Sequence, residues 1–494
     1  MMRNFRKKTF ALGLTLALAL LCALAPLAES APCEVTPLII INGMNAVPLF
    51  SDYGTPQARQ EFPPTAAHLL GAARAVPGLA RAGLHRDWSL YCDAVMPMFS
   101  NMFEGIACNP DGSPKQDIGF ITFPNSFADD DRFGKVETGL DFDVALAERI
   151  GRDHTWLHIF DWRLAQTDLA LELDELIRRV KQETGHAQVN VISLSLGGTV
   201  MMTYLEMFGH GDIKNLIMMS SAFQGMRMAG DLYNGRVKTD AAAITHAVTQ
   251  FTKDIPVAGP AADALFCLLA ESGGMDLFIS AFDKLVENSA ERFYSEVFAP
   301  IFGQFAGVWG GIPDGDYEDA KAFLLDEDIH KDLIEKIDYY HYRVANRTRE
   351  ILEAAAAEGM TLAITSHYGV AGIPIGDSCL NTHCDGIIDT AATSAGATCA
   401  PYGETLGPGY QQKIGCGHDH LSADGVIDAS TCMFPEQTWF IKNMMHVDYS
   451  PEGDALELLV WLVQAREQYT VRSNAKFPQF MQLNSDLSLS PVVG

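Results

Sequence analysis

Short apolar runs rich in β-forming residues alternate along the chain with longer stretches of helical periodicity, and this alternation constrains the fold more than any other feature. Strands separated by helices are typical of a mainly parallel sheet covered by helices, so we predict an α/β fold. The predicted strands are Leu38–Ile41, Trp156–Phe160, Val189–Leu194, Asn215–Met219, Leu362–Thr365 and Thr438–Ile441. The clearest predicted helices are Leu169–Thr184, Arg349–Glu358 and Asp454–Gln468.

The predicted strands are unevenly spaced, and two long gaps predict insertions in the core. About 140 residues separate Met219 from Leu362, whereas an ordinary crossover needs about a dozen. We predict a large, mostly helical cap at 221–354 and a second, loop-rich insertion at 51–141. The core then consists of 31–220 and 355–470, followed by a C-terminal tail at 471–494. The predicted cap helices include Ala261–Leu269, Leu277–Asn288 and Ile329–Arg347.

Residues 1–30 have the organisation of a secretory signal peptide. They combine a basic start, a short apolar middle and a small-residue end with an Ala-x-Ser pattern that finishes at Ser30. We therefore predict a secreted protein. No later stretch reaches the ~20 uninterrupted apolar residues of a membrane span, so we expect no transmembrane anchor.

The chain is strongly acidic, with a formal net charge of −27 that becomes more negative once the basic leader is removed. Such a surface repels nucleic-acid phosphates and anionic membranes. We expect no nucleic-acid partner, and at most a transient contact with a lipid interface.

Nine cysteines follow the predicted leader, and five of them lie within 379–432. In an exported chain, cysteines are more often paired than metal-bound, so we predict disulfides in this loop-like stretch. Cys92 and Cys108 are close enough in sequence to close a second loop. Spacing alone leaves the connectivity open.

The strand at Val189–Leu194 runs into Ser195, Leu196, Gly197 and Gly198, and helical spacing resumes directly afterwards. A strand–turn–helix elbow that presents a nucleophile needs small residues two before and two after it, where this chain has Ser193 and Gly197. The pattern fits either a structural turn or a nucleophilic Ser195.

Partners for a nucleophilic serine follow in the chain order Ser, Asp, His that such elbows use. Asp385 lies in a polar loop after the Leu362–Thr365 strand, and His446 follows the Thr438–Ile441 strand. A hydroxyl needs a base to take its proton, and the imidazole needs a carboxylate to orient it and stabilise its charged form. All three residues follow strands on what would be one edge of the sheet.

With these motifs the chain resembles the α/β-hydrolase superfamily, and specifically lecithin:cholesterol acyltransferase-like enzymes and bacterial lipases. The resemblance covers most of 36–465 apart from the insertions and rests on LIIINGMNAVPLF, IFDWRLA, the Ser195 elbow, CDGIIDTAATS and MMHVDY. It implies Ser195 as nucleophile, Asp385 as acid and His446 as base. It also implies the backbone N–H groups of Met44 and Leu196 as oxyanion donors.

The chain departs from that family at two positions. Leu194 stands where the family usually has His before the nucleophile, and Asn42-Gly43 stands where it usually has His-Gly or Pro-Gly. Neither departure removes a catalytic group, because the oxyanion donors are backbone amides. Both departures leave the substrate class open.

Other residues compete for these roles. Asp424 lies in a second DGxID string, and Asp377 and Asp389 flank Asp385. The string around Asp385 also has part of a calcium-loop spacing, without the terminal Glu, and Asp448 is a weak calcium candidate. The string GCGHDH offers zinc ligands at Cys416, His418 and His420, without a second ligand pair at finger spacing.

Taken together, the sequence predicts a secreted serine hydrolase that cleaves carboxylic esters, favouring acyl lipids, through an acyl-enzyme that water or another alcohol releases. No cofactor is required for this chemistry, and Ca²⁺ stays a weak alternative. Two rival functions stay open. One is the same fold acting on thioesters or amides, and the other is a non-catalytic exported binding protein.

Overall fold

In the computed structural model the chain divides into two units, Met1–Thr36 and Pro37–Gly494, and the fold described below is that of the second. The predicted leader, the helix Ala261–Leu269, most of Leu277–Asn288, and Asp377, Cys267 and Cys379 lie outside the described residues. The structure describes residues 33–44, 46–65, 68, 75–85, 87–133, 140–238, 284, 286–376 and 382–494.

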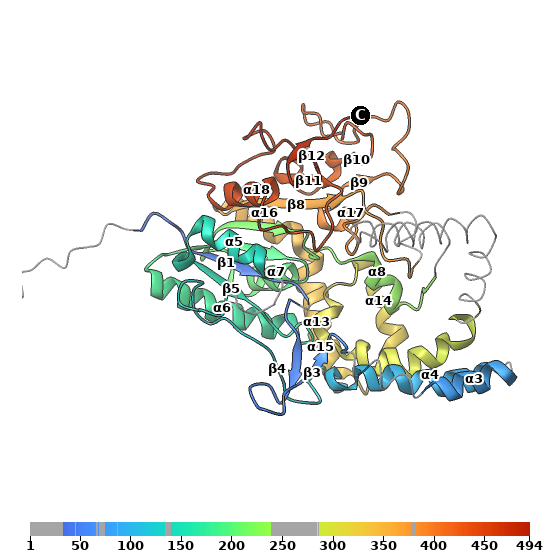
Figure 1. Cartoon of the computed structure of the whole chain (residues 1–494). Helices are drawn as coiled ribbons and strands as arrows, with labels where there is room; N and C mark the ends of the chain where they lie inside the picture. The colour runs from blue at the N-terminus through green and yellow to red at the C-terminus, as the bar shows by residue number, and fades with distance from the viewer. Residues whose placement is uncertain are drawn as a thin grey trace, which may run out of the picture. The chain divides into compact units, whose positions relative to one another are not determined.

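A central eight-stranded sheet organises the molecule, in the order β13-β12-β11-β8-β7-β6-β1-β5 (Figure 1). All neighbours pair in parallel except β12 and β13, which are antiparallel. All six predicted strands are present, with ends that shift by up to three residues, so the predicted α/β architecture is confirmed. The strands are β1 (Leu38–Ile41), β5 (Thr155–His158), β6 (Val189–Leu194), β7 (Ile213–Met219), β8 (Thr361–Tyr368), β11 (Thr438–Lys442), β12 (Phe480–Leu483) and β13 (Leu489–Pro491).

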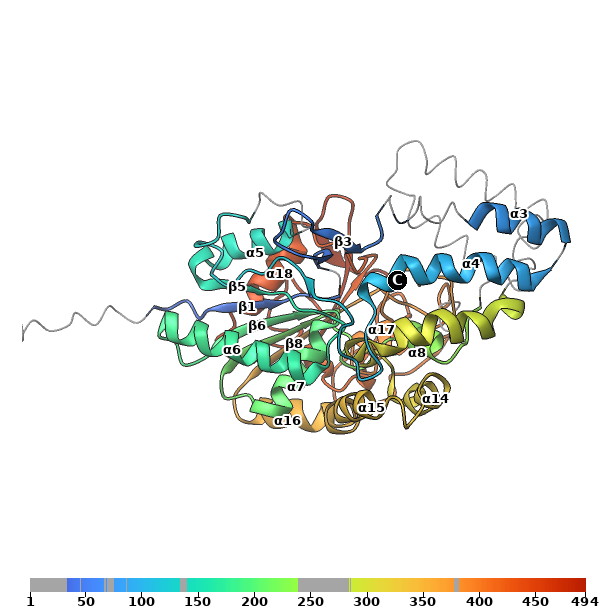
Figure 2. The same cartoon turned by 90° about the horizontal axis from the view of Figure 1, so that it is seen from below.

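Helices cover both faces of the sheet because the strands are apolar on both faces. Alternate residues of a strand point to opposite sides, so Ile39 and Ile41 of β1 join one buried cluster while Leu38 and Ile40 join another. Helices α6, α7 and α16 pack in the first cluster and α5 and α18 in the second, on opposite sides of the strands in Figure 2. These helices are α5 (Asp141–Ile150), α6 (Gln166–Thr184), α7 (Gly197–Phe208), α16 (Thr348–Ala357) and α18 (Asp454–Val463).

The insertion at 51–141 is more ordered than the sequence predicted. A three-stranded antiparallel sheet of β2 (Leu49–Ser51), β3 (Arg59–Phe62) and β4 (Ile118–Gly119) forms there. Helices α3 (Val76–His85) and α4 (Trp88–Phe103) follow β3. The strands are too short to give a clear alternation, and Pro97 inside α4 interrupts the helical signal.

The described part of the segment between β7 and β8 is helical, as predicted. It contains α8 (Arg227–Tyr233), helical residues 286–304, α13 (Ala306–Trp309), α14 (Asp314–Leu324) and α15 (Lys331–Asp338). These helices bury a cluster of their own around Trp309 and Tyr317.

The two insertions contact each other. Arg292 donates to Asp93 of α4 at 2.8 Å, and the rings of Phe99 and Phe293 meet edge to face with centroids 5.9 Å apart. Helix α4 lies beside the helical residues 286–301 in both views (Figures 1 and 2). Two segments far apart in sequence therefore form one helical layer beside the sheet.

The predicted C-terminal tail is instead part of the sheet. Strands β12 and β13 lie within it, and β12 pairs with β11 from Phe440 onward. Their sequences mix apolar and polar residues over only a few positions, which gives too weak a pattern to predict. Helix α18 ends at Val463, five residues before the predicted end.

No disulfide joins any two of the described cysteines, so the predicted pairing of Cys92 with Cys108 is wrong. Cys108 is fully buried, and burial raises the pKa of its thiol to about 11. The buried side chains of Cys92, Cys108 and Cys432 pack as small apolar groups. The described cysteines are Cys33, Cys92, Cys108, Cys384, Cys399, Cys416 and Cys432.

A search of the described residues for a helix with the length and apolar character needed to cross a membrane finds none.

Candidate active site

Ser195 occupies a strained elbow between β6 and α7. Its φ is 54°, in the left-handed region that costs an ordinary L-residue about 1–2 kcal/mol. A backbone held there against its preference turns the chain sharply between strand and helix. Strain of this kind persists where the surrounding structure enforces it, and it clusters at functional sites.

The glycines around the elbow are required by close packing. A Cβ on Gly43 would lie 2.6 Å from the Cβ of Ser195 and 3.0 Å from its Oγ. A Cβ on Gly197 would lie 2.7 Å from the carbonyl oxygen of Asn42, and one on Gly198 would lie 2.6 Å from the Cβ of Ser221. The loop that follows β1 therefore lies directly against the Ser195 side chain.

Asp385 and His446 are in direct contact. Nδ1 of His446 lies 2.7 Å from Oδ2 of Asp385, and the two side chains are 9% and 1% exposed. The backbone also joins them, because the N–H of His446 donates to the carbonyl of Asp385 at 2.7 Å. The sequence-predicted acid and base are thus brought together.

The contact favours the charged form of both groups. Burial alone would raise the pKa of Asp385, but the charge and hydrogen bond of His446 outweigh it and hold that pKa below its ordinary value. Burial alone would lower the pKa of His446, and the carboxylate raises it above its ordinary value instead. An imidazolium formed at His446 is therefore stabilised by its neighbour.

The loop after β8 fixes the orientation of Asp385. Its Oδ1 accepts from the N–H groups of Ile387 and Ile388 at 3.0 and 2.7 Å. A bridge between Val370 and Cys384 closes the loop just before it. One carboxylate oxygen is held by the backbone, which leaves the other for His446.

The segment after β7 contacts both Ser195 and His367, the histidine beside this pair. The N–H of Ala222 donates to the carbonyl of Ser195 at 2.8 Å, and Oγ of Ser220 lies 3.2 Å from Nδ1 of His367. His367, at the end of β8, lies beside Asp385 and His446, and burial lowers its pKa to about 4. No hydrogen bond joins Ser195 Oγ to His446 in the described part of the chain, although both lie at the same sheet edge.

The predicted oxyanion donors belong to two segments that meet at Ser195. Leu196 is the residue before the first turn of α7, and Met44 follows Gly43 in the turn after β1, with its side chain 46% exposed. Beneath that turn, Asn42 donates to the carboxyl of buried Asp143 at 3.4 Å. Burial raises the pKa of Asp143 to about 7.

The competing aspartates have other partners. Asp424 accepts from Lys442 at 2.8 Å and from Tyr368 at 3.1 Å. Asp389 caps α17 (Thr390–Thr393). Asp448 accepts from the N–H of Met445 at 3.3 Å. Asp385, Asp424 and Asp448 belong to neither group of three or more possible metal ligands found among the described residues.

Sequence reasoning missed Ser220, His367 and Asp143, because none of them lies in a local motif. Asp161 and Arg163 of the DWRL string form a buried ion pair at 2.6 Å. The structure also brings Cys416, His418 and His420 together and adds Glu436, which no local pattern had indicated.

Comparison with known proteins adds no assignment to this geometry: no family model matches the chain, and no curated protein matches it.

Proposed function

We propose that this protein is a serine hydrolase that cleaves carboxylic esters through an acyl-enzyme. The observation that carries the proposal is the buried Asp385–His446 pair at the sheet edge where the strained elbow presents Ser195. A strained serine alone fits a structural turn. A histidine held by a buried carboxylate at the same edge supplies the base that a nucleophilic serine needs.

In the proposed reaction, Ser195 Oγ attacks the acyl carbonyl while His446 takes the hydroxyl proton at Nε2. Asp385 keeps the Nδ1 proton in place and stabilises the imidazolium. The backbone N–H groups of Leu196 and Met44 donate to the oxyanion, and His446 then protonates the leaving alcohol. Water activated by His446 attacks the acyl-enzyme and restores Ser195. Another alcohol in place of water would give acyl transfer.

The sheet supports an α/β-hydrolase assignment. Its order places the strands before Ser195, Asp385 and His446 in parallel, with the helical segment inserted between β7 and β8. We assign that segment, together with α4, as a cap over the site. The apolar rings at their junction, Phe99 and Phe293, suit an acyl-lipid substrate. The basic, apolar leader supports secretion.

Active-site labelling tests the proposal most directly. The mature protein should react with a fluorophosphonate probe, and peptide mapping should place the label on Ser195. The matched control is Ser193→Ala, which removes a buried hydroxyl two residues away. Labelling at any other serine, or full labelling of Ser195→Ala, would contradict the assignment.

A substrate panel separates the remaining alternatives. Esters, thioesters and amides of one acyl chain, assayed with sites counted by the same probe, give the preferred bond. An ester series of increasing acyl length gives the chain preference. A protein that binds acyl lipids but neither hydrolyses any member nor reacts with the probe would be the non-catalytic binding protein.

A further inference from the structure

We propose that Cys416, His418, His420 and Glu436 form a Zn²⁺ site that fastens the long loop before β10 to the segment that leads into β11. The loop is joined to strand β10 (Ile427–Asp428) by a bridge between Leu421 and Asp428. This site is remote from the proposed catalytic residues and does not depend on their function.

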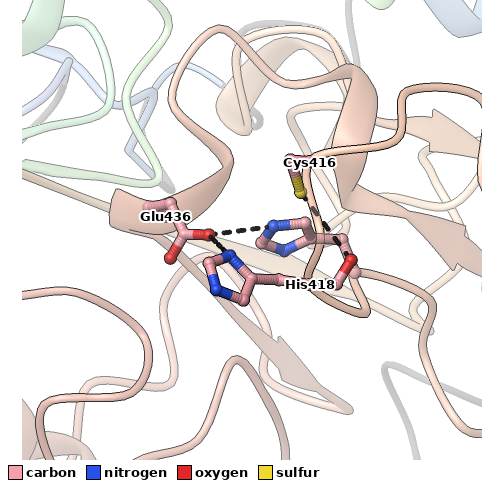
Figure 3. A group of neighbouring side chains, drawn as sticks. Cys416, His418 and Glu436 are labelled. Carbon is pink, nitrogen blue, oxygen red and sulfur yellow. Dashed lines mark hydrogen bonds and ion pairs between the residues drawn. The ribbon is translucent and has the colours of Figure 1, made fainter.

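The four side chains converge from two segments, as Figure 3 shows for Cys416, His418 and Glu436. One donor atom from each lies within 4.8 Å of every other. Nδ1 of His418 lies 2.9 Å and Nε2 of His420 lies 3.2 Å from the same oxygen, Oε1 of Glu436. Ligands of tetrahedral Zn²⁺ lie about 3.3–3.8 Å apart, so binding needs adjustments of about an ångström.

The ring of His420 has a free lone pair aimed into the site. Gln479 fixes its tautomer: the amide NH₂ of Gln479 donates to the carbonyls of Pro435 and Thr438, at 2.7 and 3.2 Å. The amide oxygen must then face His420, and it accepts from Nδ1 at 2.7 Å. With the proton on Nδ1, Nε2 carries a lone pair.

That lone pair has no suitable protein partner. His420 is 0% exposed, and its Nε2 makes no hydrogen bond in the described part of the chain. Its neighbour is Oε1 of Glu436, which is itself an acceptor. Two acceptors face to face repel each other unless a proton or a metal cation lies between them. Histidine ligands of zinc typically donate their other ring N–H to a carbonyl oxygen, as His420 does to Gln479.

Glu436 is suited to the same role. Arg472 pairs with its other oxygen, Oε2, which leaves Oε1 directed at the two imidazoles. The ion pair with Arg472 uses the carboxylate form of Glu436, which is also the form that binds a metal.

The loop that carries the other ligands is ordered by Gln412. Its amide oxygen accepts from the N–H of His420 at 2.7 Å. Its NH₂ group donates to the carbonyl of His418 at 3.1 Å and lies 3.8 Å from Sγ of Cys416. These bonds place the three loop ligands before any ion binds, which lowers the cost of assembling the site.

The donor set favours zinc over other common ions. A thiolate and two imidazoles exclude the hard ions Ca²⁺ and Mg²⁺, and a four-ligand N, S and O set fits tetrahedral Zn²⁺. One thiolate and one carboxylate neutralise the ion. Glu436 precedes β11 whereas His446 follows it, so the site and the proposed catalytic residues lie at opposite ends of the strand. The ion's role is therefore structural.

Metal analysis of the purified full-length mature protein tests the site. Each protein is treated with chelator, reconstituted with Zn²⁺ and analysed by elemental mass spectrometry. The unmodified protein should hold one equivalent more Zn²⁺ than Cys416→Ser or His418→Ala. Each variant should weaken Zn²⁺ binding at least about 100-fold. Loss of a residue that only hydrogen-bonds a metal ligand costs up to about 100-fold, so a larger loss indicates a ligand. His85→Ala is the matched control, because His85 is an exposed histidine outside the cluster.

Two further readouts distinguish a built site from surface binding. Co²⁺ in place of Zn²⁺ should give a thiolate charge-transfer band that Cys416→Ser abolishes. Zn²⁺ should raise the melting temperature of the unmodified protein and of His85→Ala but not of the two site variants. Equal Zn²⁺ content in all four proteins, no retained Zn²⁺, or Cys416 found in a disulfide by non-reducing peptide mapping would overturn the proposal.

Discussion

His446 is held by Asp385 at two points: Nδ1 lies 2.7 Å from the Oδ2 of the aspartate, and the backbone N–H donates to its carbonyl at the same distance. The loops that follow β8 and β11 are therefore joined by main chain as well as by side chain. A base anchored in this way keeps its orientation while the proton moves, which is the requirement that general-base catalysis places on a histidine.

Removing the proposed nucleophile should abolish the reaction without unfolding the protein. We expect Ser195→Ala to lower kcat for ester hydrolysis roughly a thousandfold or more, because no other group can form the acyl-enzyme. Alanine, like serine, is strained in the left-handed backbone conformation of position 195, so the substitution does not remove that strain. The melting temperature should therefore change little. Steady-state kinetics and thermal unfolding check both expectations. Ser193→Ala, the control, should keep activity within several-fold.

The two aspartates of the DGxID strings should differ sharply. Asp385→Asn should lower kcat about a thousandfold or more, since an amide in that place favours the wrong imidazole tautomer. Asp424→Asn should have a modest effect, because Asp424 pairs with Lys442. Kinetics of both variants at one pH, with circular dichroism to verify folding, make the comparison. A dead Asp424 variant beside an active Asp385 variant would reverse the assignment.

The activity should also report the raised pKa of His446. The base must be neutral to accept the serine proton, so kcat/KM should fall on the acid side with a midpoint above the ordinary value of about 6.5. Residual activity of Asp385→Asn should show that midpoint shifted downward, since the stabilising carboxylate is gone. A pH–rate profile of both proteins decides it. The same midpoint in both proteins would show that the pH–rate profile does not report the Asp385–His446 pair.

Much of the central sheet and the Ser195 elbow could be predicted because the responsible patterns are local. A buried parallel strand is a contiguous apolar run, and the elbow is a contiguous string of small residues around one serine. Strands β12 and β13 were missed because their pattern is weak: β12 forms on the edge that β11 offers, and β13 on the edge of β12.

The choice between Asp385 and Asp424 could not be made from the strings, because DGIID and DGVID look alike. The choice is made by tertiary packing, which directs one aspartate to His446 and the other to Lys442. Glu436 was missed for a related reason. It lies in a different segment from the Cys-x-His-x-His string and meets it only in the folded chain.

The closeness of Gly43 to Ser195 gives a steric prediction. Gly43→Ala would place a methyl group 2.6 Å from the Cβ of Ser195, so the loop or the serine must move. We expect kcat/KM to fall at least about tenfold and stability to fall by about 1–3 kcal/mol, as for other overpacked sites. Gly211→Ala is the control, because an added Cβ there meets nothing within 4 Å. Gly43→Ala kinetics equal to those of the control would show that the loop yields freely and does not position the site.

Asp143 beneath the same loop should make the stability pH-dependent. Its folded pKa of about 7 lies above the ordinary value of 3.8, so the group stabilises the fold fully below about pH 4, and this contribution is lost as the pH rises through about 7. Asp143→Asn keeps an acceptor for Asn42 and has no charge to bury. We expect equal stability of the two proteins near pH 4 and a gain for the variant of up to about 4 kcal/mol at pH 8, from about 1.4 kcal/mol per pKa unit. Urea unfolding at both pH values measures the difference. A variant that is less stable at pH 8 would show that the Asp143 carboxylate is instead stabilised where it lies.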